Sequence, residues 1–192
     1  MDTNTVANGR IVRIIGDITE KLAQKVTEEL FECQSEPKIP VSLLISSDGG
    51  SLHAARKLCD LIAYVLVTPV HGIAFGKCNS AASLILAHCD KRIATPNAHF
   101  IIHSFSFLDE TIKFKADVQK HVERMMKEGH ANQQQMIRMY HERLGLTKGE
   151  VKKLMARGDQ HFDDYLGAEE AKKIGLVTEI TRTPLNIFPE VS

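Results

Sequence analysis

Ser80 is the residue whose type and position most strongly suggest chemistry. It follows the turn residues 76–79 (GKCN), where a predicted strand gives way to a predicted helix, and the small residues 81–83 come after it. A hydroxyl there lies beside unpaired helix N–H groups and the positive end of the helix dipole, which can stabilise a developing oxyanion. Spacing alone nevertheless favours the commoner role of a serine at a helix start, which is that of an N-cap.

A serine nucleophile needs a base, and His103 is the candidate because it ends an apolar segment directly before Ser104. Asp163, between two predicted helices, could orient that base, and Asp164 is its close competitor. The alternative is that His103 is a strand-end histidine without a task, and because the chain has nine histidines, the absence of a task is a strong alternative for any one of them. The carboxylates can equally belong to a solvated turn. We expect the other histidines at the surface or the core edge: His53, His71, His88, His99, His121, His130, His141 and His161.

A second glycine-marked turn, SSDGGS at residues 46–51, follows a buried apolar run. Gly49 and Gly50 are explained either by a tight turn with positive φ or by a backbone N–H that points at a substrate carbonyl. The pattern is not a phosphate loop, because no GK[ST] follows it, and it is not a GxGxxG fingerprint.

The elements that would position these residues alternate along the chain. Strands are predicted at 10–15, 41–45, 69–75, 91–94, 98–103 and 176–180. Helices are predicted from an apolar stripe at 18–30, at 52–62, from about residue 80, at 117–144 with an interruption at Gly129, after a capping box of Thr147 and Glu150, and at 168–174. The pattern predicts one α/β domain over 1–192, with a core of about 10–180 and a mostly parallel sheet. Ligands bind such sheets at the carboxyl ends of the strands, where Ser80 and Gly49 lie.

Composition narrows the function classes. Lys plus Arg equals Asp plus Glu at 24 each, which argues against nucleic acid and anionic membranes as partners. The four cysteines have no zinc-ligand spacing, and Cys59 and Cys89 lie in apolar runs, so we expect no metal, no cofactor and a reducing compartment. The first ten residues carry no apolar signal segment, and the run 61–67 is too short to span a bilayer. We therefore expect a cytoplasmic protein.

Four segments, in the same order and register, resemble motifs of the Clp protease proteolytic subunit (ClpP) family over about residues 10–180. SSDGG at 46–50 resembles N-S-P-G-G, and GKCNSAA at 76–82 resembles G-x-A-A-S-M-G. TPNA at 95–98 followed by IIH at 101–103 resembles L-P-N-A/S…M-I-H. DDYLGAEEA at 163–171 with GLV at 175–177 resembles D-x-F-x-S-A-x-E-A…G-L-[VI].

The resemblance implies a crotonase-like (ClpP-type) α/β spiral of repeated β-α units, with 117–144 as a long protruding handle helix. It implies a serine endopeptidase that cleaves unfolded polypeptide or peptides, a homo-oligomer of stacked rings, and a possible AAA+ unfoldase partner. The resemblance implies that Ser80 is the nucleophile and that His103 is its base, which Asp163 would orient. It also implies that Gly49 and Ala81 are the oxyanion donors and that Gly50 and Ser51 bind substrate.

The chain also departs from the family pattern, which keeps other functions open. Asp48 replaces the proline, Ala81 replaces the methionine, and SFSFL follows His103 at 104–108. A divergent endopeptidase is the first hypothesis. The alternatives are a non-catalytic or regulatory paralogue, a phage head-maturation-type protease, and a crotonase-type acyl-thioester enzyme.

Overall fold

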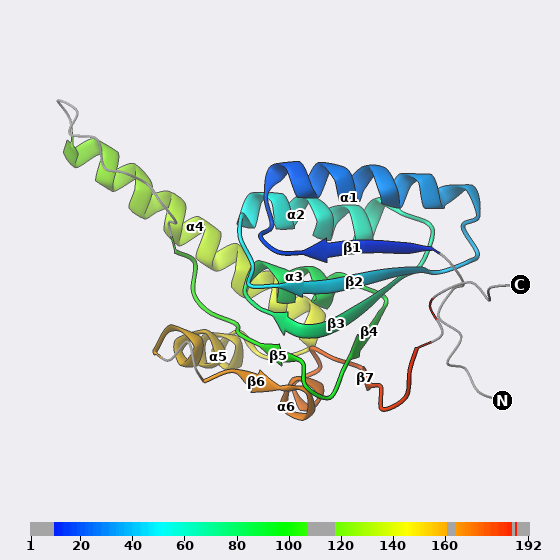
Figure 1. The fold of residues 1–192 in the computed structure, drawn as a ribbon. Coiled ribbons are helices and arrows are strands. Elements are labelled where there is room, and N and C mark those ends of the chain that lie inside the picture. Colours follow the sequence, from blue (N-terminus) through cyan, green and yellow to red (C-terminus); the bar gives the residue numbers. More distant parts are fainter. Residues whose placement is uncertain (1–9, 107–117, 161–163, 186, 188–192) are drawn as a thin grey trace, which may run out of the picture.

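The computed structural model describes residues 10–106, 118–160, 164–185 and 187. Strands and helices alternate through these residues (Figure 1). The strands are β1 (Ile11–Ile15), β2 (Val41–Ser47), β3 (Val70–Cys78), β4 (Lys91–Ala94), β5 (His99–Phe100), β6 (Leu166–Gly167) and β7 (Glu179–Ile180). The helices are α1 (Glu20–Glu32), α2 (Leu52–Asp60), α3 (Ala81–His88), α4 (Val118–Leu144), α5 (Lys148–Gln160) and α6 (Ala168–Lys173), with short turns η1 (Cys33–Ser35) and η2 (Leu61–Val65).

The sheet is mostly parallel, as the sequence predicted. Its main path is β1-β2-β3-β4-β7, and every pairing along it is parallel. Beyond the last residue that pairs with β4, the end of β3 turns to pair with β5, which in turn pairs antiparallel with β6. The carboxyl ends of β2 and β3 meet where Ser47 pairs with Cys78, so the two glycine-marked turns lie side by side.

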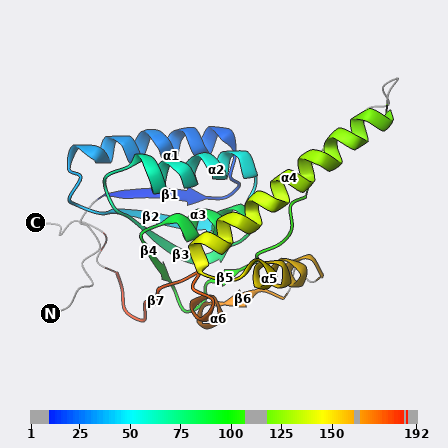
Figure 2. The ribbon, with the colours of Figure 1, turned by 180° about the vertical axis from the view of Figure 1, so that it is seen from behind.

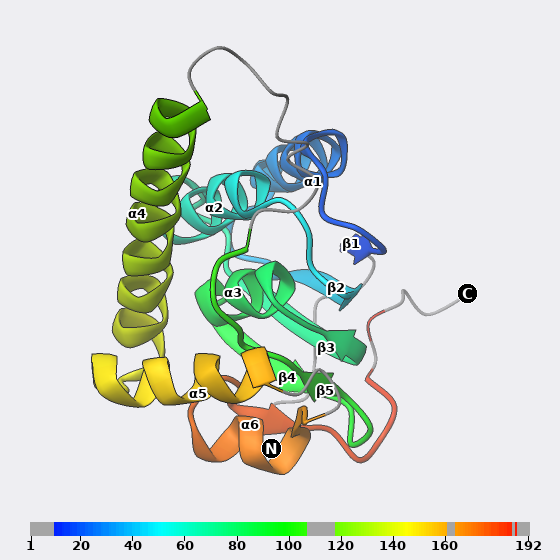
Figure 3. The same cartoon turned by 90° about the vertical axis from the view of Figure 1, so that its left-hand side faces the viewer.

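The helical face of the sheet holds the main core. Side chains of β2 such as Leu43 and Ile45 pack there with Leu58 of α2 and Leu84 of α3, all of them fully buried. Figure 3 shows α1, α2 and α3 together on this side of the strands. On the opposite face, Ile187 near the end of the chain packs against two sheet residues in a small second cluster, Ile73 of β3 and Ile93 of β4.

Helix α4 extends well past the rest of the structure (Figure 2), which confirms the protruding helix. Its 27 residues are continuous through Gly129, so the predicted interruption was wrong: the flanking turns keep the helix, and a lone glycine only weakens it. The second half of α4 carries its buried residues and packs on α3 and α5: Met136, Ile137, Met139 and Tyr140. The capping box that begins α5 is confirmed, because Thr147 and Glu150 exchange hydrogen bonds.

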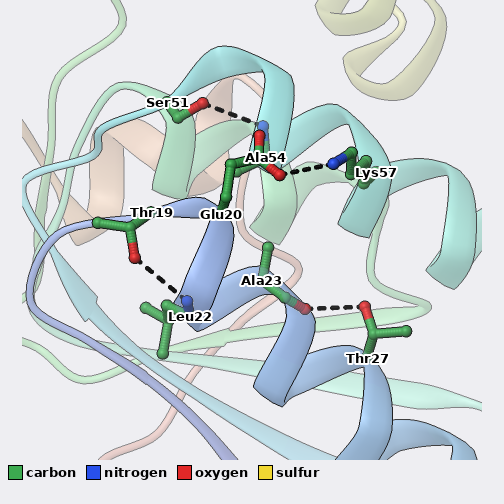
Figure 4. A network of polar contacts seen from close by, with 8 residues as sticks. All are labelled: Thr19, Glu20, Leu22, Ala23, Thr27, Ser51, Ala54 and Lys57. Atoms are coloured by element: carbon green, nitrogen blue, oxygen red, sulfur yellow. Dashed lines mark hydrogen bonds and ion pairs between the residues drawn. The ribbon is translucent and has the colours of Figure 1, made fainter.

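Some predicted boundaries were wrong. Strand β3 continues past Gly76, which takes a φ of +63° inside the strand instead of ending it. Ile18 lies outside α1, because Thr19 caps that helix through the Leu22 N–H (Figure 4). Ile18 instead forms a β-bridge with Gly50. The strands predicted at 98–103 and 176–180 each shrink to two residues. No helix in the described part of the chain is long and apolar enough to cross a membrane.

Candidate active site

Ser80 has the most unusual backbone in the described part of the chain. Its φ of 53° and ψ of −125° make it the one non-glycine residue there with positive φ. Such a conformation costs on the order of 1–3 kcal/mol and persists only where its surroundings enforce it. Ser80 occupies the N-cap position of α3, yet its side chain makes no capping hydrogen bond. The N-cap interpretation of its hydroxyl was therefore wrong, and Oγ is left for another role.

The backbone of Ser80 is held on both sides. Its N–H donates to the carbonyl of Ile101, with an N···O distance of 2.7 Å. Its carbonyl accepts the Ser83 hydroxyl at 2.8 Å and the Tyr140 hydroxyl at 3.3 Å. One residue earlier, the Asn79 N–H donates to the carbonyl of Ser47 at 3.0 Å. These bonds tie the strained turn to the ends of β2 and β5 and to α4.

His103 and Ser80 line the same two pockets, so the structure brings these two predicted residues together. One pocket has a volume of about 890 Å³ and extends toward α1, α2 and α4, while the other has about 490 Å³ and extends toward β5 and Tyr165. The Nδ1 atom of half-buried His103 lies 2.6 Å from the carbonyl oxygen of Ser104. A carbonyl accepts only, so Nδ1 carries the proton in the neutral ring and Nε2 carries the lone pair.

The segment after His103 is anchored from two helices. The Ser104 N–H donates to the Asp159 carboxylate of α5 at 2.8 Å, and the Phe105 N–H donates to the Gln133 side chain of α4 at 2.6 Å. Gln133 also donates to the Ser104 hydroxyl at 3.2 Å. The site is therefore fixed by residues far from it in sequence.

The predicted orienting residue, Asp163, lies outside the described residues. Its neighbour Asp164 is described, and its carboxylate accepts the Arg157 guanidinium at 2.6 Å. Arg157 also bonds Glu170, so it joins the end of α5 to the start of α6. These two carboxylates raise the pKa of Arg157, the Asp164 bond first.

The two predicted oxyanion donors differ. Ala81 is the first residue of α3, so its N–H has no acceptor within the helix. The Gly49 N–H donates to the Ser47 hydroxyl at 3.0 Å, and its role as an oxyanion donor stays a prediction. Gly49 is adjacent to Ser80: a Cβ built on Gly49 would lie 2.7 Å from Ser80 Cβ, and the φ of Gly49 is +112°.

The predicted substrate-binding residues Gly50 and Ser51 form a short parallel bridge with Ile18. Ile18 donates to the Gly49 carbonyl, and Ser51 donates to the Ile18 carbonyl, both at 2.8 Å. In such a parallel bridge the N–H and C=O of Gly50 itself point away from Ile18. Gly50 lines the larger pocket, so these groups can pair with an extended peptide there. The hydroxyl of Ser51 is occupied, because it caps α2 (Figure 4).

Two carboxylates that line the pockets, those of Glu20 and Asp48, are in ion pairs. Glu20 at the start of α1 pairs with Lys57 of α2 (Figure 4), and that bond lowers the pKa of Glu20. Asp48, where the family has proline, accepts from Lys77 and from Asn79, both at 3.1 Å. The introduced carboxylate is thus neutralised locally by the strand that precedes Ser80.

Sequence reasoning missed several residues at the site. Lys77, His99 and Tyr165 line the smaller pocket, and the His99 and Tyr165 rings lie 4.9 Å apart. Tyr140 reaches Ser80 from the end of α4. His99 alternates with buried Phe100 on a strand beside β3, and this alternation could have indicated that His99 faces away from the core toward the pocket. No local signal ties Tyr140 to Ser80, because 60 residues separate them. Within the described residues, no three His, Cys, Asp or Glu side chains are grouped as a metal site.

Comparison with known proteins agrees with this architecture. The model of the Clp protease family matches residues 2–184. The ATP-dependent Clp protease proteolytic subunit 2 of Treponema denticola is 27% identical over 183 residues, which cover 94% of this chain and 86% of that protein. Subunit 3 of Rhizobium meliloti is 30% identical over 173 residues, 89% of this chain and 83% of that protein.

A solved structure of a ClpP1 mutant from Listeria monocytogenes has a similar fold. It superposes with a TM-score of 0.77 at 26% sequence identity, over 91% of this chain and 92% of that one. The mixed α/β fold with its parallel sheet is therefore that of ClpP. The match spans nearly the whole chain, and this chain belongs to the Clp protease family.

Proposed function

We propose that this protein is a serine endopeptidase that hydrolyses peptide bonds through an acyl-enzyme on Ser80. The observation that carries the proposal is the strained Ser80, whose uncapped hydroxyl shares two pockets with His103. A sharp strand-to-helix turn of this kind exposes a nucleophile at the top of a sheet. The relatives named proteolytic subunits add family support.

In the proposed reaction an extended peptide pairs with the free edge of Gly50, which presents its scissile carbonyl to Ser80. Nε2 of His103 takes the hydroxyl proton as Oγ attacks the carbonyl carbon, and Asp163 stabilises the imidazolium that forms. The N–H of Ala81 and, once it turns from Ser47, that of Gly49 hold the oxyanion. His103 returns the proton to the leaving amine, and water then hydrolyses the acyl-enzyme with the same base.

An activity probe tests this proposal. A fluorophosphonate should label the wild-type protein, while Ser80→Ala should remove the label and His103→Ala should slow it by several orders of magnitude. Labelled peptide recovered after digestion should contain Ser80. An unlabelled wild type, or equal labelling of Ser80→Ala, would contradict the proposal.

One observation favours the second candidate, a regulatory paralogue whose site is switched on by a partner chain. The Gly49 N–H is occupied by Ser47 in this isolated chain, so one oxyanion donor is closed. Such a protein should be labelled by the probe only after a catalytic paralogue is added. Labelling of the purified protein alone decides for the first candidate.

The family and the composition support a setting for the proposed activity. All four cysteines are free, which suits a reducing cytoplasm. Exposed apolar residues at η2 and the chain after it, Tyr64, Val65 and Val67, suit burial between copies of the chain in stacked rings. An AAA+ unfoldase would then supply unfolded polypeptide. Native mass spectrometry that finds only monomer would remove the ring from this proposal.

A further inference from the structure

A buried polar chain connects α4 to the nucleophile. The Tyr140 hydroxyl lies 2.8 Å from Ser83 Oγ, and Ser83 Oγ lies 2.8 Å from the carbonyl oxygen of Ser80. A carbonyl only accepts, so the Ser83 proton points at Ser80. Each hydroxyl has one proton, and therefore Tyr140 donates to Ser83 in the arrangement that uses both short contacts. Tyr140 also lies 3.3 Å from the same carbonyl, close enough to donate directly.

The chain is placed where water cannot replace it. Tyr140 and Ser83 are both fully buried. Burial raises the pKa of Tyr140, so its hydroxyl keeps its proton throughout the working range of a protein. Neither residue lines either of the two pockets, so neither touches a substrate bound there. A pair of buried hydroxyls that meets only the nucleophile's backbone has one evident task, which is to fix that backbone.

The geometry points to Tyr140 and Ser83 as positioning residues that hold the Ser80 carbonyl and thereby maintain the strained backbone that presents Oγ to His103. Apart from these hydroxyls, the carbonyl accepts the Leu84 N–H at 3.3 Å. Without the pair, the Ser80 carbonyl loses two of its donors, and the backbone can turn about both the N–Cα and the Cα–C bond of Ser80, which relieves the positive φ. The inference rests on the proposed function for its catalytic consequence, but its structural consequence can be measured by itself.

The test is a double-mutant cycle of Tyr140→Phe and Ser83→Ala. Each single variant leaves one hydroxyl able to donate to Ser80, so each should lower kcat and the fluorophosphonate labelling rate by less than about tenfold. The double variant should lose roughly 10- to 100-fold, more than the product of the singles, because the two donors substitute for one another. KM should stay unchanged in all three variants.

The matched control is Met139→Ala, which removes buried apolar contacts from the same turn of α4 without touching Ser80. If labelling falls with thermal stability equally in Met139→Ala and in the double variant, the role of the pair is structural only and the inference is overturned. An unchanged labelling rate in the double variant overturns it as well.

A crystal structure of the double variant keeps this test separate from the proposed function. The inference expects the φ of Ser80 to leave the positive region, whether or not the wild type reacts with the probe. A wild type that is never labelled defeats the proposed function, while an unchanged Ser80 backbone in the double variant defeats the inference.

Discussion

At the scale of single residues, the site depends on how closely two turns approach each other. Gly49 lies against Ser80 with no room for a side chain, and its φ is one that other residues rarely adopt. Ser80 itself has positive φ without being glycine. Gly49, which has no side chain, thus makes space for Ser80, the proposed nucleophile.

Gly49→Ala should therefore abolish reactivity more than folding. The added Cβ must displace Ser80, and a displacement of about 1 Å at a reacting atom can cost on the order of 100-fold in rate. Gly145→Ala is the matched control, because Gly145 also has positive φ, at +69°, but a Cβ there meets nothing within 4 Å. Fluorophosphonate labelling and thermal unfolding of both variants make the comparison, and equal labelling of the two would contradict the prediction.

The sequence could place Ser80 and His103 at the carboxyl edge of a parallel sheet because both follow strand-like segments, and the two residues do line the same pockets. Spacing alone favoured a capping role for Ser80, and only the resemblance to the family made it the candidate nucleophile. It could not predict that the Gly49 N–H donates to Ser47, since a serine rotamer decides that bond. Nor could it predict Tyr140, whose place depends on how α4 packs against α3. The role of Asp163 remains a prediction.

At the scale of elements, periodicity predicted the long helices well and the short strands poorly. The apolar stripe that ends in Tyr140 and Leu144 specifies α4 because the pattern repeats over many turns. Strand β5 keeps two residues because its partners are the end of β3 and β6, which lies 66 residues further along the chain. Pairing at that distance leaves no local pattern to detect.

The contact that Arg157 makes between α5 and α6, called the clamp here, is also a contact between elements that no local pattern predicts. Arg157 bonds Asp164, the residue directly after Asp163, and Glu170 of α6. Arg157→Met should loosen the segment that carries Asp163, and we expect labelling of Ser80 to fall several-fold while the melting temperature falls little. Arg182→Met is the control, because Arg182 pairs with Glu169 in a more exposed ion pair that contributes little. If both variants lose labelling equally, the clamp does not position the site.

At the scale of the whole molecule, buried histidines make the stability of the fold depend on pH. His88, at the end of α3, is buried, and its Nδ1 lies 2.8 Å from the carbonyl oxygen of Leu84. Burial lowers the pKa of His88 most, and Arg143 lowers it further, while the Leu84 bond, Asp60 and Glu142 oppose the shift. The pKa of half-buried His71 is lowered too, again first by burial.

The sign of the resulting pH dependence is fixed. The pKa of His88 in the folded chain lies below its ordinary value of about 6.5. At a pH between these two values, the unfolded chain therefore binds a proton at His88 that the folded chain does not bind. The contribution of neutral His88 to the free energy of unfolding is therefore fully present above about pH 6.5, and it decreases as the pH drops through that value toward the folded pKa.

His88→Gln removes the titrating group while its amide can still donate to Leu84. The melting temperature of this variant should fall less steeply than that of the wild type between about pH 7.5 and pH 5.5, measured at one protein concentration because self-association also shifts it. His130→Gln, on an exposed position of α4, is the matched control for the loss of a histidine. A wild-type acid slope that His88→Gln leaves unchanged would show that other groups, His71 among them, carry the dependence.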